Sequence, residues 1–125
     1  MTNTISLDSV TFYLDAWNNT DPDARAEAVA AVFTEDARYV DPLADVTGHE
    51  AIAALIGGVQ QQFPGFVFRP VGEPVAHHDV VRFSWGLGPD GEEPPVIGSD
   101  SVVRAADGRV SLVLGFLDRT RPRHA

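Results

Sequence analysis

Two aspartates that stand among apolar residues are the side chains of this sequence best suited to acid–base chemistry. Asp41 lies between Val40 and Pro42 at the end of a short β-prone segment, although an Asp-Pro step is also an ordinary way to begin a turn. Asp100 lies in residues 96–104, whose alternation turns it toward apolar neighbours, where an unpaired carboxylate is costly unless it keeps its proton or finds a partner. The ordinary alternatives for Asp100 are a hydroxyl or amide that satisfies it, or a register that leaves it outside.

Tyr13 is the third candidate for a functional site. Its predicted helix already has Leu14 and Trp17 for the core, so the Tyr13 hydroxyl is free to point into a cavity. Taken alone, a tyrosine at such a position is more often a packing residue. Its role therefore depends on whether it meets the two aspartates.

The sequence predicts neither a metal site nor a cofactor. His77 and His78 are neighbours in a predicted strand, where adjacent side chains point to opposite faces and cannot bind one ion together. His49 is better explained as part of the start of a helix than as a ligand. Residues 86–88 (Gly-Leu-Gly) lack the third glycine and the following helix of a dinucleotide motif, and the chain has no cysteine.

The first part of the chain has the spacing of two helices. Apolar residues recur every three or four positions over residues 7–18, which predicts a helix with one buried side. Asp21 and Pro22 then supply a cap and a proline at the first helical position, so a second helix begins there. The two helices are expected to form a hairpin.

A short strand and a third helix follow. Residues 38–41 are β-prone, and Pro42 ends the strand at Asp41. Thr47 and Glu50 have the spacing of a capping box, and the helical pattern that follows them ends at residues 63–64, Phe-Pro.

Alternating apolar residues replace helical spacing after Gly65. This pattern predicts strands at about residues 65–73, 75–87, 95–105 and 109–118. The expected breaks are Glu73-Pro74, the acidic loop 88–95 and the turn 106–108.

The turn at Gly108 predicts the register of the last two strands. A three-residue hairpin with Gly108 in the left-handed conformation pairs Ala105 with Arg109 and places Asp100 opposite Leu114. Asp100 then faces inward. The side chains expected to line a substrate pocket, by the two-residue period of the strands and the helix stripe, are Trp17, Phe83, Trp85, Val102, Leu112, Leu114 and Phe116, with Val81 in the same cavity.

These elements predict an α+β fold with three N-terminal helices packed on one face of a curved antiparallel sheet, which together form a cone with an open mouth. A chain of 125 residues suits a single domain spanning residues 1–125. With 44% hydrophobic and 22% charged residues, the composition is that of a soluble globular protein rather than a disordered or fibrous one.

Charge and hydropathy exclude several classes of partner. The formal net charge of −9 repels nucleic-acid phosphates and anionic lipid, so neither nucleic acid nor a membrane surface is expected to bind. No apolar run is long enough to span a membrane, and the first residues lack the pattern of a secretory signal. We therefore expect a cytoplasmic protein.

The order of these features resembles the NTF2-like superfamily, and within it the SnoaL-like and ketosteroid isomerase-like families. The resemblance covers nearly the whole chain and is carried by residues 13–18, 33–42, 47–48 and 98–110. In ketosteroid isomerases, a tyrosine on the first helix and an aspartic acid on the third long strand form an oxyanion hole, and an aspartate in the Asp-Pro step is the base. Those positions are Tyr13, Asp100 and Asp41 in this sequence.

The resemblance implies an NTF2-like cone that acts as a cofactor-independent, isomerase-like enzyme on a small apolar carbonyl compound of steroid or polyketide type. Asp41 would move a proton from the carbon beside the carbonyl to a conjugated carbon, while Tyr13 and neutral Asp100 hydrogen-bond the dienolate oxygen. Burial is then expected to raise the pKa of Asp100. Asp41, beside the mouth, is expected to be ionised.

Two alternatives stay open. The same cone could serve as a non-catalytic small-ligand-binding protein, or the chain could be a polyketide-cyclase-like enzyme. The cyclase pattern needs an acid–base pair on the last two strands, yet the inward positions predicted there are apolar and Asp118 stands at the strand end. The resemblance also implies a homodimer, formed by the outer sheet face that carries Arg82 and Ser84.

Overall fold

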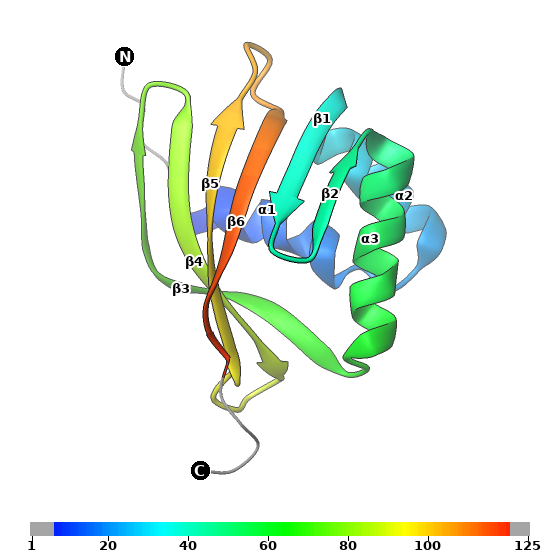
Figure 1. Ribbon diagram of the computed structural model, residues 1–125, viewed down its shortest axis with the longest axis vertical. Helices are drawn as coiled ribbons and strands as arrows, with labels where there is room; N and C mark the ends of the chain where they lie inside the picture. Colours follow the sequence, from blue (N-terminus) through cyan, green and yellow to red (C-terminus); the bar gives the residue numbers. More distant parts are fainter. Residues whose placement is uncertain (1–6, 121–125) are drawn as a thin grey trace.

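The computed structural model describes residues 7–120, which form helices packed against a curved sheet (Figure 1). The helices are α1 (Leu7–Asn18), α2 (Pro22–Val32) and α3 (His49–Gln62). The strands are β1 (Phe33–Asp41), β2 (Ala44–Thr47), β3 (Phe66–His77), β4 (Val80–Pro89), β5 (Val96–Arg104) and β6 (Val110–Thr120). The prediction of an α+β fold with three helices on a sheet is confirmed, although two strands precede the third helix.

The six strands form one sheet in the order β2-β1-β6-β5-β4-β3. All neighbours are antiparallel except β1 and β6, which run parallel, so the sheet is not antiparallel throughout as predicted. In Figure 1, α1 crosses behind the sheet, while α2 and α3 lie beside β1 and β2. The parallel pair places the end of β1 beside the middle of β6.

Of the two helix caps predicted from the sequence, the cap of α2 is confirmed and the cap of α3 is not. The Asp21 side chain accepts a hydrogen bond from the Ala24 backbone N–H (2.9 Å) and caps α2, as expected. The capping box predicted for α3 is wrong, because Gly48 is the N-cap and no side chain makes a capping hydrogen bond at the N-terminus of this helix. Gly48 has φ +95°, and its N–H donates to the Ala37 carbonyl of β1 (2.9 Å). The left-handed backbone of a glycine thus makes this junction.

The prediction of a break at Glu73-Pro74 is also wrong. β3 continues through this step with an irregularity between Val71 and Val75, and the chain turns at His78, whose φ is +53°. β3 is an edge strand, where a proline removes no ladder hydrogen bond on its open side. β2 is a strand that the sequence pattern did not predict.

The register of β6 differs from the prediction beyond its first pair. The Ala105 N–H donates to the Arg109 carbonyl (2.7 Å) and Gly108 has φ +90°, as expected. An irregularity between Val103 and Arg104 then shifts the pairing by one residue, so that Asp100 pairs with Gly115 rather than Leu114. A one-residue shift moves every later side chain to the other face.

The inner face of β6 is therefore made by Val113 and Gly115. Val113 is fully buried, whereas Leu114 is 39% and Phe116 57% exposed. The prediction that Leu112, Leu114 and Phe116 line the inner face is wrong for this reason. The inward direction of Asp100 is nevertheless right, since β5 itself is regular there.

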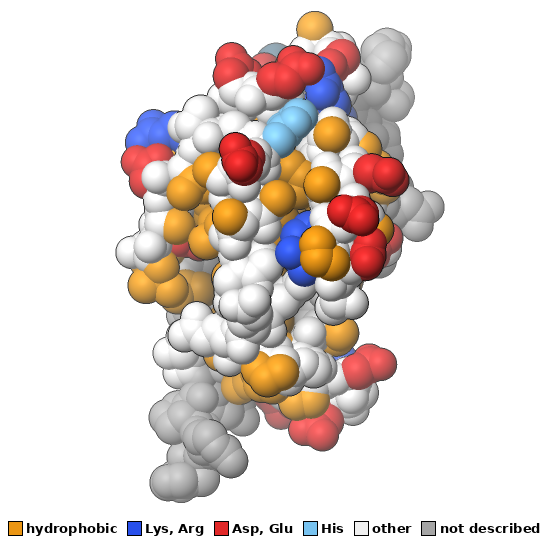
Figure 2. Space-filling view, turned by 90° about the vertical axis from the view of Figure 1, so that its right-hand side faces the viewer, with side chains coloured by type: hydrophobic (Ala, Val, Ile, Leu, Met, Phe, Trp, Pro, Cys, Tyr) orange, Lys and Arg blue, Asp and Glu red, His pale blue; other side chains and the backbone are white. Residues whose placement is uncertain are grey.

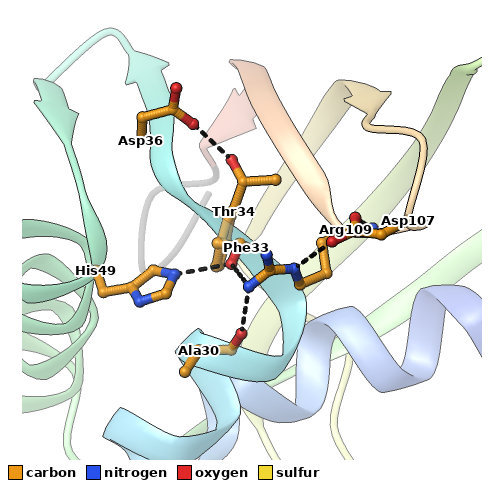
Figure 3. A network of polar contacts seen from close by, with 7 residues as sticks. All are labelled: Ala30, Phe33, Thr34, Asp36, His49, Asp107 and Arg109. Carbon is orange, nitrogen blue, oxygen red and sulfur yellow. Dashed lines mark hydrogen bonds and ion pairs between the residues drawn. The ribbon is translucent and has the colours of Figure 1, made fainter.

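A polar joint, made by hydrogen bonds to the Phe33 carbonyl, stabilises the point where α2 ends and β1 begins (Figure 3). The Phe33 carbonyl accepts a hydrogen bond from His49 Nε2 (2.7 Å) and a longer one from Arg109 Nη1 (3.3 Å). Arg109 also donates to the Ala30 carbonyl and pairs with Asp107. His49 thus belongs to the start of α3, as expected, and ties that start to β1.

The core lies between the helices and the inner face of the sheet. Its largest fully buried side chains are Phe33, Ile52, Ile56, Val29 and Val113. On the outside, acidic side chains are spread over the face shown in Figure 2, in keeping with the net charge of −9.

Candidate functional site

A cavity of about 270 Å³ opens between α1, α3 and the inner face of the sheet. All three predicted catalytic residues line it: Tyr13 from α1, Asp41 from the end of β1 and Asp100 from β5. The rest of its wall is almost wholly apolar and includes Leu14, Trp17, Tyr39, Leu43, Phe68, Trp85, Leu87, Gly115, Phe116 and Leu117. Such a wall suits an apolar ligand that brings a few polar atoms.

Asp100 is the buried acid of the cavity, with 4% of its surface exposed. Burial raises its pKa to about 7, an effect that the nearby Trp85 and Tyr13 polar hydrogens oppose and the negative charge of Asp41 supports. Its Oδ1 atom has no hydrogen-bond partner among residues 7–120. A large share of Asp100 is therefore protonated near neutral pH and can donate a hydrogen bond.

Tyr13 stands beside Asp100, with 5% of its surface exposed. Its ring packs edge-on against Phe33 and Phe83, with centroids 5.8 Å and 5.4 Å away. Burial, with the charge of Asp100 next in importance, raises the Tyr13 pKa well above its ordinary value, so the hydroxyl keeps its proton. That hydroxyl also lacks a hydrogen-bond partner in the described part of the chain.

Asp41 is half-buried, and its carboxylate accepts three hydrogen bonds. The backbone N–H groups of Leu43 and Ala44 donate to Oδ1 at 2.8 and 2.9 Å, so the turn role foreseen for an Asp-Pro step is real. The Tyr39 hydroxyl donates to Oδ2 at 2.8 Å. A carboxylate accepts about four hydrogen bonds, so Asp41, which lines the cavity, has one acceptor position left for a ligand.

Gly115 makes the space that the two acids share. A Cβ atom at this position would lie 2.9 Å from Asp100 Oδ1 and 3.3 Å from the Asp41 Cβ. Gly98 does the same for the cavity wall, because a Cβ there would collide with the Trp85 ring. Two glycines on adjacent strands therefore shape the cavity.

Trp17, Trp85 and Phe116 line this cavity as predicted, and Phe116 does so although its strand position faces outward. Phe83 and Val102, together with Val81, line a different cavity on the other side of Tyr13. Leu112 and Leu114 line neither. The predicted pocket is thus divided in two, and Leu112 and Leu114 were wrongly assigned to it because of the register shift described above.

Tyr39 is a polar residue of the cavity that was not predicted from the sequence. It hydrogen-bonds Asp41, and its ring lies 5.4 Å from that of Trp17. Burial is the main reason that its pKa lies far above the ordinary value. The signal was present, since Tyr39 stands two residues before Asp41 and so shares its face of the strand.

The model of the SnoaL-like domain family matches residues 10–113. The chain belongs to the SnoaL-like family. Its three-helix, six-stranded arrangement is the NTF2-like fold.

Solved structures have the same fold as this SnoaL-like protein. A candidate isomerase of the SnoaL-like family from Agrobacterium tumefaciens is 39% identical, with a TM-score of 0.85. The match covers 90% of this chain and 97% of the Agrobacterium chain. A candidate polyketide cyclase from Sinorhizobium meliloti is 24% identical over 86% and 93% of the two chains, with a TM-score of 0.67. A SnoaL-like protein of unknown function from Burkholderia thailandensis is 16% identical over 94% and 98%, with a TM-score of 0.72. A search of the curated proteins finds no match.

Two further features bear on partners. In residues 7–120, no group of three or more His, Asp or Glu side chains is placed to hold a metal ion. No helix of the described chain is long and apolar enough to cross a membrane.

Proposed function

We propose that this SnoaL-like protein is a cofactor-independent, isomerase-like enzyme that moves a proton within a small apolar carbonyl compound of steroid or polyketide type. The observation that carries the proposal is the pair of unlike acids in one apolar cavity: Asp100 is buried with a raised pKa, and Asp41 is half-buried among hydrogen-bond donors. Acids in such contrasting surroundings are suited to opposite tasks in one reaction.

In this mechanism, Asp41 removes a proton from the carbon beside the carbonyl group. The electron pair of that C–H bond moves onto the carbonyl oxygen and gives a dienolate, and protonated Asp41 then returns the proton to the far end of the conjugated system. Tyr13 and neutral Asp100 donate hydrogen bonds to the dienolate oxygen. The unpartnered Tyr13 hydroxyl and Asp100 Oδ1 support this role, since a ligand oxygen would satisfy polar atoms that are otherwise costly to bury.

The apolar wall supports the substrate class. Three aromatic rings pack edge to face around the cavity. The ring centroid of Phe68 lies 5.3 Å from that of Trp17 and 5.2 Å from that of Trp85. They offer flat surfaces to a flat, fused or conjugated ring system. Among residues 7–120, no charged side chain other than the two acids lines this cavity, so a neutral substrate is favoured over a charged one.

The test is turnover of a 5-ene-3-ketosteroid, followed by the absorbance of the conjugated product. We expect activity in the natural protein, and a loss of about 10²- to 10⁴-fold in Asp41→Asn, the range for removal of a general base. Asp15→Asn makes the same change on the exposed side of α1 and should leave activity unaltered. Undiminished turnover in Asp41→Asn would exclude Asp41 as the base.

The same experiment separates the alternatives. Steroid binding without turnover would favour a non-catalytic ligand-binding protein. A cyclase of the pattern considered above lacks support, because the inner positions of β6 are Val113, Gly115 and Leu117, and Asp118 is exposed. The correct register thus leaves that strand without an acid–base pair, as the predicted register did.

A homodimer through the outer sheet face belongs to the same proposal. Leu114 and Phe116 are 39% and 57% exposed on the strand that neighbours β5, and they extend the face that carries Arg82 and Ser84. Covering such side chains by a second copy would remove apolar surface from water. Light scattering at micromolar concentration should give the mass of a dimer, and Leu114→Glu should shift it toward that of a monomer.

A further inference from the structure

A second cavity, of about 310 Å³, lies on the other side of Tyr13 from the candidate active site. It is enclosed by the first turns of α1, the end of α2 and the hairpin end of β4, β5 and β6. Its wall consists mainly of Val10, Phe12, Val32, Val81, Phe83, Val102 and Val110. Its size is at the lower end of the range for small-molecule pockets.

Among the described residues of this wall, Arg104 is the one with a charged side chain. It is the last residue of β5 and has the same inward parity as Asp100 and Val102. Its Nε atom is buried and has no hydrogen-bond partner in residues 7–120. The ion pairs of that part of the chain use Arg38 and Arg109 instead.

A buried guanidinium nitrogen without a partner is costly, which makes the missing partner informative. The planar guanidinium group matches a carboxylate, which can accept two parallel hydrogen bonds from it. Among the described side chains that line this cavity, none is acidic and able to supply one. Apart from Ser9 and Tyr13, the other described side chains of the wall are apolar, so it suits a hydrocarbon body attached to that carboxylate.

We propose that the cavity at Arg104 is a second binding site, for a small amphipathic monocarboxylate whose carboxylate pairs with the Arg104 guanidinium and whose apolar chain lies among Val81, Phe83 and Val102. The two cavities differ in charge, which separates their ligands. The Asp41 carboxylate faces the first cavity and repels an anion, whereas Arg104 attracts one to the second. The inference does not depend on the proposed isomerase activity.

The probe is octanoate, titrated by calorimetry into the whole protein. We expect saturable binding, with affinity that rises about fourfold per methylene from butanoate to octanoate, as the burial of each methylene predicts. Methyl octanoate has the same chain without the charge and should bind at least about tenfold more weakly than octanoate.

Arg104→Met keeps the aliphatic stem and removes the charge. It should weaken octanoate binding at least about tenfold, whereas Arg82→Met, the same change on the exposed outer face of β4, should have no effect. Methyl resonances locate the ligand: those of Val81 and Val102 should shift, and those of Leu14 and Leu43 in the first cavity should not.

Three results would overturn the proposal: no saturable octanoate binding, equal affinity in Arg104→Met and the natural protein, or methyl shifts confined to the first cavity. Steroid turnover by Asp41 is a separate readout, so failure of either proposal is visible without the other.

Discussion

Gly115 lies directly opposite Asp100 in the ladder between β5 and β6, and a side chain at position 115 would begin 2.9 Å from Asp100 Oδ1. The buried acid therefore owes its position to a missing side chain on the neighbouring strand. Asp41 crowds the same point from the other side, because its Cβ lies 3.3 Å from the place that a new Cβ would take.

Gly115→Ala should accordingly displace Asp100 and reduce ligand binding and any turnover. Overpacking of this kind costs about 1–3 kcal/mol of unfolding free energy, which urea titration would measure. Gly58→Ala is the matched control, because a Cβ there meets nothing within 4 Å and alanine favours the helix. An unchanged stability and ligand affinity in Gly115→Ala would show that the space between the acids is not needed.

The raised pKa of Asp100 predicts a pH dependence of stability with a definite sign. Below about pH 4 the folded and unfolded chains both hold this proton, whereas between about pH 4 and 7 only the folded chain does. The contribution of Asp100 to stability therefore falls as pH rises through this window, by up to roughly 4 kcal/mol, and is constant above it.

This dependence is read as the difference in unfolding free energy between Asp100→Asn and the natural protein at each pH, since the other carboxyl groups cancel. The difference should grow in favour of Asp100→Asn up to about pH 7. Asp100→Leu should be more stable still, because it removes the buried carboxyl group, yet it should lose activity that Asp100→Asn partly retains. A flat difference would show that Asp100 ionises like an exposed aspartate and cannot act as the proposed donor.

Tyr13→Phe separates catalysis from packing. The Tyr13 hydroxyl is buried without a partner in the described residues, so its removal should leave the melting temperature unchanged or slightly higher. Loss of a donor to the dienolate oxygen should nevertheless reduce kcat about 10²- to 10³-fold. If stability fell and turnover did not, Tyr13 would be a packing residue.

The joint at Phe33 offers a prediction about stability alone. His49→Ala removes the 2.7 Å hydrogen bond to the Phe33 carbonyl. The unfolding free energy should fall by only about 1 kcal/mol, because Arg109 still donates a hydrogen bond to this carbonyl. His77→Ala, at an exposed position near the end of edge strand β3, is the control and should change little. Thermal unfolding of the two variants makes the comparison, and equal melting temperatures would contradict the role given to His49.

Local patterns were sufficient to predict the helices, the strand that ends at Asp41 and the inward direction of Asp100. Each of these depends on a period within one element or on a nearby proline or cap. The errors share another cause: the irregularity after Val103 and the continuation of β3 through Pro74 depend on which strand lies alongside. A two-residue period contains no information about a neighbouring strand's bulge, so Leu114 was assigned to the wrong face.

The same reasoning explains which parts of the site could be predicted. Asp41, Tyr13 and Asp100 were found from their types and local surroundings, and the structure brings them to one cavity. The division of the predicted pocket into two cavities could not be found, because it follows from the way Tyr13 packs against Phe33 and Phe83 on other elements.

The parallel pairing of β1 with β6 also has a consequence for the order of folding. Val40, next to Asp41, pairs with Leu114, more than seventy positions later in the chain, and Gly115 follows at once. Contacts so distant in sequence close a large loop and form slowly. During synthesis, the helices and β1 can gather before β6 has left the ribosome, but Asp41 and Asp100 can share a cavity only after it has. The cavity in which the chemistry is proposed to occur is therefore complete only at the end of folding.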